Sequence, residues 1–173
     1  MRNYNVSTQE VIGDIRGGMR IDTGIINATT LLDHSPSLAV NLFTVVGRIL
    51  LLQLYVEVTT VLSADAAQLQ FVVTFTTPVI AENAMGAKCG SLSGAVAGLR
   101  IVYIGGAVSN AAVITDSAGL SDVTCVSPHI VGGSGFIGKI GTLCSDATCT
   151  TGALQASLHY IPYSDGAYVA ALL

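Results

Sequence analysis

The sequence predicts an all-β protein whose body is an antiparallel β-sandwich or barrel. Apolar residues recur at every second position in several segments, which is the period of a β-strand. The candidate strands follow one another at intervals of about ten residues, and Gly, Ser, Asn or Asp stands in each gap. No segment keeps the 3.6-residue period over the length of an ordinary helix, and only 63–69 resembles an amphipathic turn.

The composition indicates a protein that covers apolar surface by assembling. The chain has 173 residues, a length typical of one domain, and 51% of them are hydrophobic while only 10% are charged. The most apolar window, 38–62, could span a bilayer by length, but it contains Arg48 and Glu57, and each charge near the centre of a membrane helix costs about 3 kcal/mol. The first residues lack the pattern of a signal peptide. We therefore expect a soluble protein made in the cytoplasm.

The charges exclude two classes of partner. The formal net charge is −4, and the basic residues are spread singly along the chain. A protein that follows a phosphate backbone needs a cluster of Lys and Arg. We therefore expect no nucleic-acid partner, and no membrane partner either.

Residues 1–40 differ from the rest of the chain. Their charges are scattered, and Gly13, Gly17, Gly18 and Gly24 interrupt any regular element. The sequence thus predicts two parts, an extended N-terminal arm over 1–40 and a β-sandwich body over 41–173. Such an arm buries too little apolar surface to order by itself, so a chain that begins near Ser37 should keep a folded body and attach more weakly to its partners.

The two clearest strands are predicted over 49–58 and 69–77. In the first, the alternation assigns one set of side chains to a buried face and the other to a mixed face: Leu50, Leu52, Leu54, Val56 and Val58 against Ile49, Leu51, Gln53, Tyr55 and Glu57. In the second, the inward set is Leu69, Phe71, Val73 and Phe75, and Pro78 ends the strand. Further strands are expected over 99–104, 111–115, 123–131, 136–144, 154–161 and 167–172.

The stretch Gly-Gly-Ser-Gly-Phe-Ile-Gly at 132–138 is similar to the phosphate-binding turn of NAD-dependent sugar epimerases. That turn has to lie between a parallel strand and a helix, with an acidic residue about 20 positions later. Here 139–144 favours a strand, and Asp146 and Asp165 lie at the wrong spacing. We therefore expect a glycine-rich turn or bulge that leads into a strand, and no cofactor; an NAD-binding epimerase-like enzyme is the remote alternative.

No catalytic or metal site can be assembled from the sequence. The histidines, His34, His129 and His159, are not paired by spacing with a second ligand, and Gly-x-Ser-x-Gly is absent. His159 alternates with Ser157 and Ile161 on a predicted strand, where a partly exposed structural histidine is expected. The sequence thus predicts a protein that is not an enzyme.

The cysteines leave their redox state open. Of the four, at 89, 125, 144 and 149, Cys144 and Cys149 flank a four-residue segment that could close a hairpin. Paired strands would place them opposite each other, where either a disulfide or two thiols are compatible with the spacing. A zinc site would need a second close pair of ligands, which the sequence lacks.

Two regions resemble the small β-sandwich virion proteins of tailed bacteriophages. One is the closing segment, in which a strand ending in an aromatic residue is followed by Pro-x-Ser-Asp-Gly and a short Val/Ala strand; the other is "LFTVVGRILLLQLYVEVTTVL". Together they cover 42–61 and 128–171. The resemblance implies a jelly-roll-like structural subunit of the virion, often a homotrimer, that binds itself and the major capsid protein or other virion proteins as a head decoration or cement protein. A tail, head-fibre or receptor-binding module is the alternative.

Overall fold

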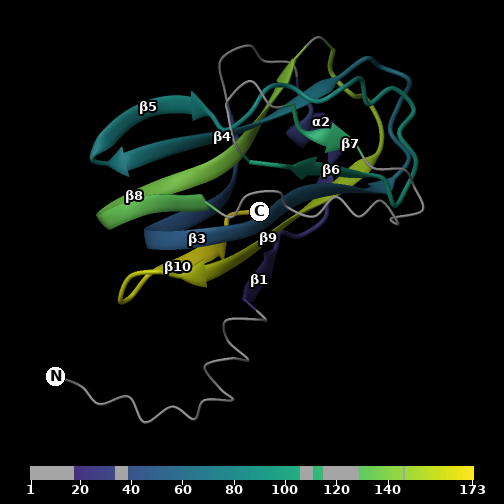
Figure 1. Cartoon of the computed structure of the whole chain (residues 1–173). Coiled ribbons are helices and arrows are strands. Elements are labelled where there is room, and N and C mark those ends of the chain that lie inside the picture. Colours follow the sequence, from purple (N-terminus) through teal and green to yellow (C-terminus); the bar gives the residue numbers. More distant parts are fainter. Residues whose placement is uncertain (1–17, 34–38, 106–110, 115–128, 146) are drawn as a thin grey trace, which may run out of the picture.

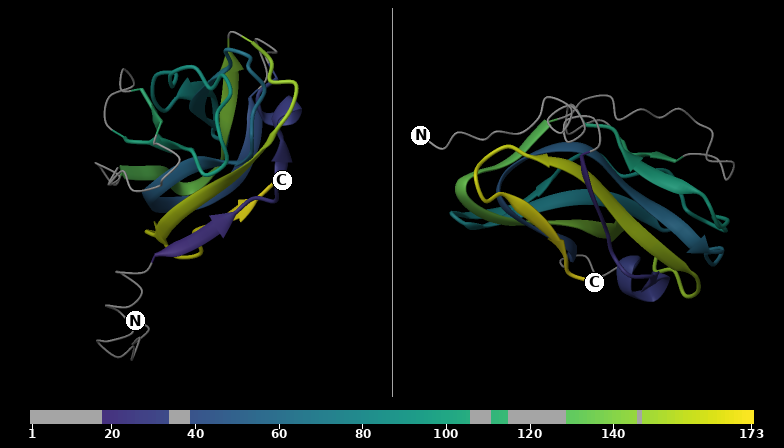
Figure 2. Two further views of the ribbon diagram at one scale, coloured as in Figure 1. Left: turned by 90° about the vertical axis from the view of Figure 1, so that its right-hand side faces the viewer. Right: turned by 90° about the horizontal axis from the view of Figure 1, so that it is seen from below.

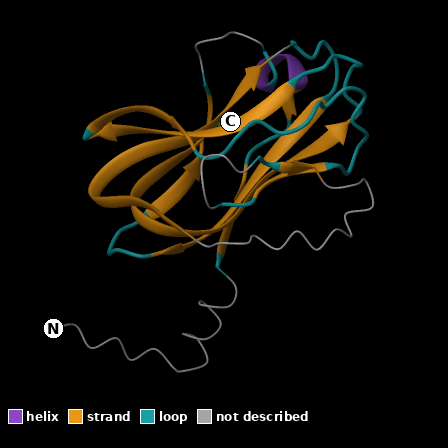
Figure 3. Cartoon of the chain, turned by 45° about the horizontal axis from the view of Figure 1, so that its top comes forward, coloured by secondary structure: helices purple, strands orange, loops and turns teal. Residues whose placement is uncertain are grey.

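The computed structural model describes residues 18–33, 39–105, 111–114, 129–145 and 147–173. In these residues ten strands form a single antiparallel sheet, and a one-turn helix is the only helix described. Figures 1 and 3 show how completely strands dominate the chain. The all-β antiparallel prediction is confirmed, and no described helix is long and apolar enough to cross a membrane.

The main path of the sheet runs β1-β9-β3-β8-β4-β5, and four shorter strands pair along it. The elements are β1 (Met19–Asp22), β2 (Ile26–Asn27), α2 (Ala28–Leu31), β3 (Val40–Thr60), β4 (Gln68–Thr77), β5 (Val79–Ala84), β6 (Arg100–Tyr103), β7 (Val113–Ile114), β8 (His129–Ser145), β9 (Ala153–Pro162) and β10 (Tyr168–Ala171).

The central element is β3, a strand of 21 residues. On one side it pairs with β8 and, further along, with β6; on the other side it pairs with β10 and then with β9. Strands β9 and β10 therefore follow the same edge of β3 one after the other. Of the other long strands, β8 and β9 pair directly with β3, and β4 pairs with β8.

The sheet turns a corner at Gly47, where both neighbours of β3 insert extra residues. On the β8 side, Val46 is opposite Ile137 while Arg48 is opposite Gly132, so 133–136 bulge out of the ladder. On the other side, 163–167 separate β9 from β10 at the same level. Gly47 and Gly132 have φ angles of 75° and 84°, which glycine adopts without the steric cost that other residues pay.

The core lies inside the curled sheet. Figure 2 shows how the sheet curls. Phe71 of β4 reaches Tyr103 of β6, with ring centroids 6.0 Å apart in an edge-to-face arrangement. Loop residues close the remaining open side, and each of them is buried: Leu62, Ala67, Met85, Cys89, Leu92 and Ala95. The result is a sandwich-like domain built from one sheet.

The predicted boundary between arm and body at residue 41 is wrong. Residues 19–22 form β1, which pairs with β9, and 26–27 form β2 on the same strand. In α2 and just after it, Leu31 and Leu32 are completely buried, which stabilises the fold by about 1.5–3 kcal/mol for each side chain. The described part of the predicted arm thus belongs to the body; residues 1–17 and 34–38 lie outside the described residues.

The predicted faces of 49–58 hold only in part. Leu54, Val56 and Val58 point into the core as predicted, but so do Ile49 and Leu51. A register shift between Leu51 and Gln53 against β9 leaves one extra residue in β3. Because such a bulge exchanges the two faces of a strand, Leu50 and Leu52 lie on the outer face.

The other predicted strands are found where the structure describes the chain, with differences in extent and number. Leu69 and Phe71 are buried as expected for 69–77, and the strands predicted at 99–104, 111–115, 154–161 and 167–172 correspond to β6, β7, β9 and β10. The strand predicted at 136–144 is part of a longer β8 that begins at His129, and 123–128 lie outside the described residues. Strand β5 follows Pro78 unpredicted, and 63–67 form no helix.

Candidate interaction surface

The outer face of the sheet carries a row of side chains in register beside the Gly47 corner. Tyr168 is opposite Val46, Val46 is opposite Ile137, and Ile137 is opposite Thr77, so the row crosses four strands. Directly opposed residues of antiparallel strands project from the same face. Tyr168 is 51% exposed and Ile137 42% exposed, although both are hydrophobic. We call these four residues the corner row.

The next line of side chains on the same face is also poor in charge. Thr44 is opposite both Ala170 and Lys139, and Lys139 is opposite Thr74. Among these residues and the corner row, Lys139 is the one charged side chain. The face that β10, β3, β8 and β4 share is therefore nearly uncharged.

A pocket of about 430 Å³ opens where the two insertions meet. Asp165 supplies its charged group, and Phe136 is held at its edge by an edge-to-face contact with Phe75, with centroids 5.4 Å apart. The backbone N–H of Arg48 donates to Ser164 Oγ at 3.0 Å, which fixes the turn that carries Asp165. The lining residues are Val46, Gly47, Gly135, Phe136, Ile137, Ser164, Asp165 and Gly166.

The stretch at 132–138 helps to build this corner. It lies inside β8, where Gly132 pairs with β3 and Ile137 and Gly138 pair with both β3 and β4, and the chain continues as strand beyond it. The register shift at 133–136 confirms the predicted glycine-rich bulge. The strand-turn-helix arrangement on which the dinucleotide motif depends is therefore not the setting of these residues.

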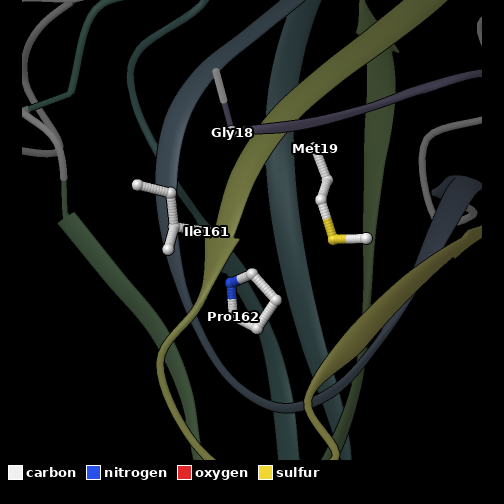
Figure 4. A pocket seen from close by; sticks show the side chains of 4 residues that line it. All are labelled: Gly18, Met19, Ile161 and Pro162. Carbon is white, nitrogen blue, oxygen red and sulfur yellow. The ribbon is translucent and has the colours of Figure 1, made fainter. Parts of the chain in front are cut away.

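A second apolar group lies on the outer face beyond the corner. Leu50 is opposite Ile130 on β8 and opposite Ile161 on β9, and Ile130 is 48% exposed. Beside it is a cavity of about 380 Å³, around which the side chains of Met19, Ile161 and Pro162 lie (Figure 4). Gly18 completes its lining. Along β3, Gly47 and Arg48 lie between this group and the corner row.

The part of the outer face over β1 and β9 is polar, and its charges are paired within the chain. Arg20 Nε lies 2.8 Å from Asp22 Oδ1, and Ser157 Oγ donates to the same oxygen at 2.6 Å. Burial disfavours the charged carboxylate, but the hydrogen bonds from Arg20 and Ser157 outweigh it, so the pKa of Asp22 lies below its ordinary value. His159 is half-buried on this face; burial, together with the nearby Arg20, lowers its pKa.

A second ion pair continues this polar region across β3 and β6. Arg100 Nε lies 2.7 Å from Glu57 Oε2, and its guanidinium carbon is 5.0 Å from the centroid of the Tyr55 ring. Tyr55 is buried beneath this cation. The outer face thus combines a polar region with internal ion pairs and an apolar region beside the Gly47 corner.

The structure does not place Cys144 and Cys149 on paired strands. Cys144 lies near the end of β8 and Cys149 lies in the loop before β9, but β3 stands between those two strands. The predicted hairpin is therefore wrong, because β8 turns away to pair with β3 and β4. Both residues carry thiols: Cys144 Sγ donates to the Ala147 carbonyl at 3.3 Å, and burial raises the pKa of the Cys149 thiol.

Within the described residues, the structure brings together no candidate metal site. His34 and the side chain of His129 lie outside the described part, and within that part no three His, Cys, Asp or Glu side chains group around a metal position. Sequence reasoning missed the corner row, because its four residues come from four different strands that only the pairing brings together. The available signal was the glycine at position 47 within an otherwise apolar strand.

Comparison with known proteins gives little further information. No family model and no curated protein matches the chain. Among solved structures, a chain of infectious bursal disease virus, Gx strain, aligns with 12% identity and a TM-score of 0.25. The match covers 89% of this chain and 34% of that one, so the chain spans about a third of the solved chain's length. A likeness at this level assigns neither a family nor a function to the chain.

Proposed function

We propose that the chain is a structural subunit of a viral particle, and that it associates with copies of itself and with the particle's shell through the apolar region of its outer face. The observation that carries this proposal is the corner row, in which the exposed Tyr168 and Ile137 lie in register on either side of the half-buried Val46. Single exposed apolar residues are normal on any protein surface, whereas a contiguous set marks an interaction site.

The distribution of charge supports the same proposal. Over β1, β3 and β6, Arg20 pairs with Asp22 and Arg100 pairs with Glu57, which suits a face turned toward solvent. The face beside the corner has few charges and exposes tyrosine and isoleucine, as the centre of a lasting interface does. The outer face of the sheet thus has one region suited to contact with solvent and another suited to contact with a protein partner.

The assignment to a bacteriophage head rests on the sequence resemblance. Residues 42–61 and 128–171 carry that resemblance, and they supply most of β3 and the whole of β8, β9 and β10. These strands include the centre of the sheet, and β10, β3 and β8 carry three of the four residues of the corner row. A decoration or cement protein of the head is the role that this resemblance favours, and the proposed location is the virion.

The experiment replaces one residue of the corner row by a charge. The variant Ile137→Asp should keep the melting temperature of the wild type within a few degrees, since the side chain is largely exposed, and should lose self-association in mass photometry. It should also fail to co-sediment with empty phage heads. Removing a buried isoleucine from an interface costs about 1.5–3 kcal/mol, so affinity should fall by at least about tenfold.

The matched control is Ile25→Asp. Ile25 is 71% exposed between β1 and β2, away from the corner row. This variant should associate and co-sediment like the wild type. A wild type that stays monomeric and does not bind heads would contradict the proposal.

A further inference from the structure

The corner row is flanked by two opposite charges that are unpaired within the described part of the chain. Lys139 lies two residues beyond Ile137 on β8, on the same face, and is opposite Thr44. Asp165 lies in the turn between β9 and β10, and it is exposed. The ion pairs that the described residues form are Arg20–Asp22 and Arg100–Glu57, and neither includes these two.

The two charges stand diagonally across Val46. Lys139 belongs to the strand on one side of β3, and Asp165 to the turn on the other side. Along β3, Lys139 is level with Thr44, whereas Asp165 lies at the level of Gly47, where the turn inserts. Val46 therefore lies near the midpoint between a positive and a negative group.

This arrangement is self-complementary. When two copies pack face to face about a twofold axis, every contact occurs twice. If one residue of the first copy contacts a second residue of the other copy, the same two residues also meet with the copies exchanged. The required axis lies in the plane of the contact, passes near Val46 and is perpendicular to the line that joins the two charges. It brings Lys139 of each copy opposite Asp165 of the other. The same operation packs the two corner rows against each other.

We propose that a second copy of this chain occupies the corner row in a twofold contact, in which Lys139 and Asp165 form two reciprocal ion pairs. This inference rests on the proposed self-association and adds its symmetry and its specificity. The trimer that the sequence resemblance implies would join two different patches head to tail. Here both charges belong to one patch, which favours twofold pairing.

The test is a charge exchange measured by sedimentation velocity on the whole chain. Lys139→Asp places two carboxylates opposite each other in both halves of the contact, and Asp165→Lys places two ammonium groups there. Each single variant should raise the dissociation constant at least about tenfold, because like charges opposite each other in an interface are strongly unfavourable. The double variant exchanges the charges and should recover wild-type association.

Mixing the two single variants identifies the symmetry. In a twofold pair of Lys139→Asp with Asp165→Lys, both contacts join opposite charges, so the mixture should associate like the wild type. In a ring of three, at least one contact still joins two copies of the same variant and stays repulsive. Lys88→Asp and Asp33→Lys change exposed charges elsewhere and should leave association unchanged.

The outcomes separate this inference from the proposed function. If Ile137→Asp abolishes association while both charge reversals associate like the wild type, or if the double variant and the mixture stay dissociated, the twofold contact is wrong and the apolar interface stands. If the wild type does not self-associate at any concentration, the twofold contact is overturned; if it also fails to co-sediment with heads, the proposed function is overturned with it. Melting temperatures of all variants should agree, which excludes loss of folding as the cause.

Discussion

Replacing Gly132 by alanine should damage the corner of the sheet far more than the same change at Gly135, three residues away in the same bulge. Both glycines have positive φ, 84° and 74°, so an alanine at either position adopts a left-handed conformation at a cost of about 1–2 kcal/mol. The surroundings differ. A Cβ at residue 132 would lie 2.2 Å from the Gly47 carbonyl oxygen, whereas a Cβ at residue 135 meets nothing within 4 Å.

The contact at residue 132 is with backbone, so β3 and β8 have to move apart to relieve it. Overpacking of this kind adds about 1–3 kcal/mol, for a total loss of about 2–5 kcal/mol in the free energy of unfolding. For a chain of this length, 1 kcal/mol corresponds to about 2–4 °C in melting temperature. Gly132→Ala should therefore melt about 4–20 °C below the wild type, and Gly135→Ala about 2–8 °C below it.

Thermal unfolding followed by far-UV circular dichroism measures both shifts, and spectra at low temperature check that each variant remains β-rich. Gly135→Ala is the matched control, because it has the same chemistry and backbone conformation without the clash. Equal melting temperatures for the two variants would refute the close approach of Gly132 to Gly47, and with it the description of the corner.

Three further outcomes are expected. Leu31→Ala should lower the free energy of unfolding by about 2–5 kcal/mol in denaturant titration, since Leu31 is completely buried, and a chain beginning at Ser37 should fail to fold; a stable truncated chain would show that the N-terminal strands are dispensable. The lowered pKa of His159 means that the unfolded chain takes up the proton first as pH falls below about 6.5, so the native state should lose stability on acidification, and His159→Gln should flatten the dependence of melting temperature on pH between about 7 and 5; an unchanged slope would contradict this. Millimolar NAD should not raise the melting temperature, whereas a dose-dependent rise would indicate a bound dinucleotide.

The parts of the fold that follow from local alternation could be predicted from the sequence. Leu69 and Phe71 alternate with polar residues, and both are buried in β4. The same rule assigned Leu50 to the core, but the extra residue at Leu52 exchanges the faces, and that bulge is set by pairing with β9. Alternation within one strand carries no information about how its partner is registered.

Edge strands and the pairing of strands far apart in the sequence could not be predicted from local patterns. Strand β1 has charged side chains at two of its four positions, which reads as an arm, yet those charges lie on the outer face while the backbone pairs with β9. The hairpin predicted between Cys144 and Cys149 presupposed that strands adjacent in sequence pair with each other. Here β3, about a hundred residues earlier in the chain, lies between them. The interaction surface depends on this same pairing, so the glycine at position 47 could indicate a bend in β3 but not the residues that meet beside it.

The central position of β3 also has a consequence for the newly made chain. This strand is complete at Thr60, but its partners β6, β8, β9 and β10 follow it, the last of them at residues 168–171. At a synthesis rate of about 5–20 residues per second, the most apolar strand waits roughly 5–20 s for its final neighbour. Until β6 and β8 are made both of its edges are open to pairing with other nascent chains, and the edge for β9 and β10 stays open longest. Production of this protein should therefore depend on the supply of chaperones that hold unfolded strands, and a chaperone-depleted host should yield aggregates in which 40–60 is the protected segment.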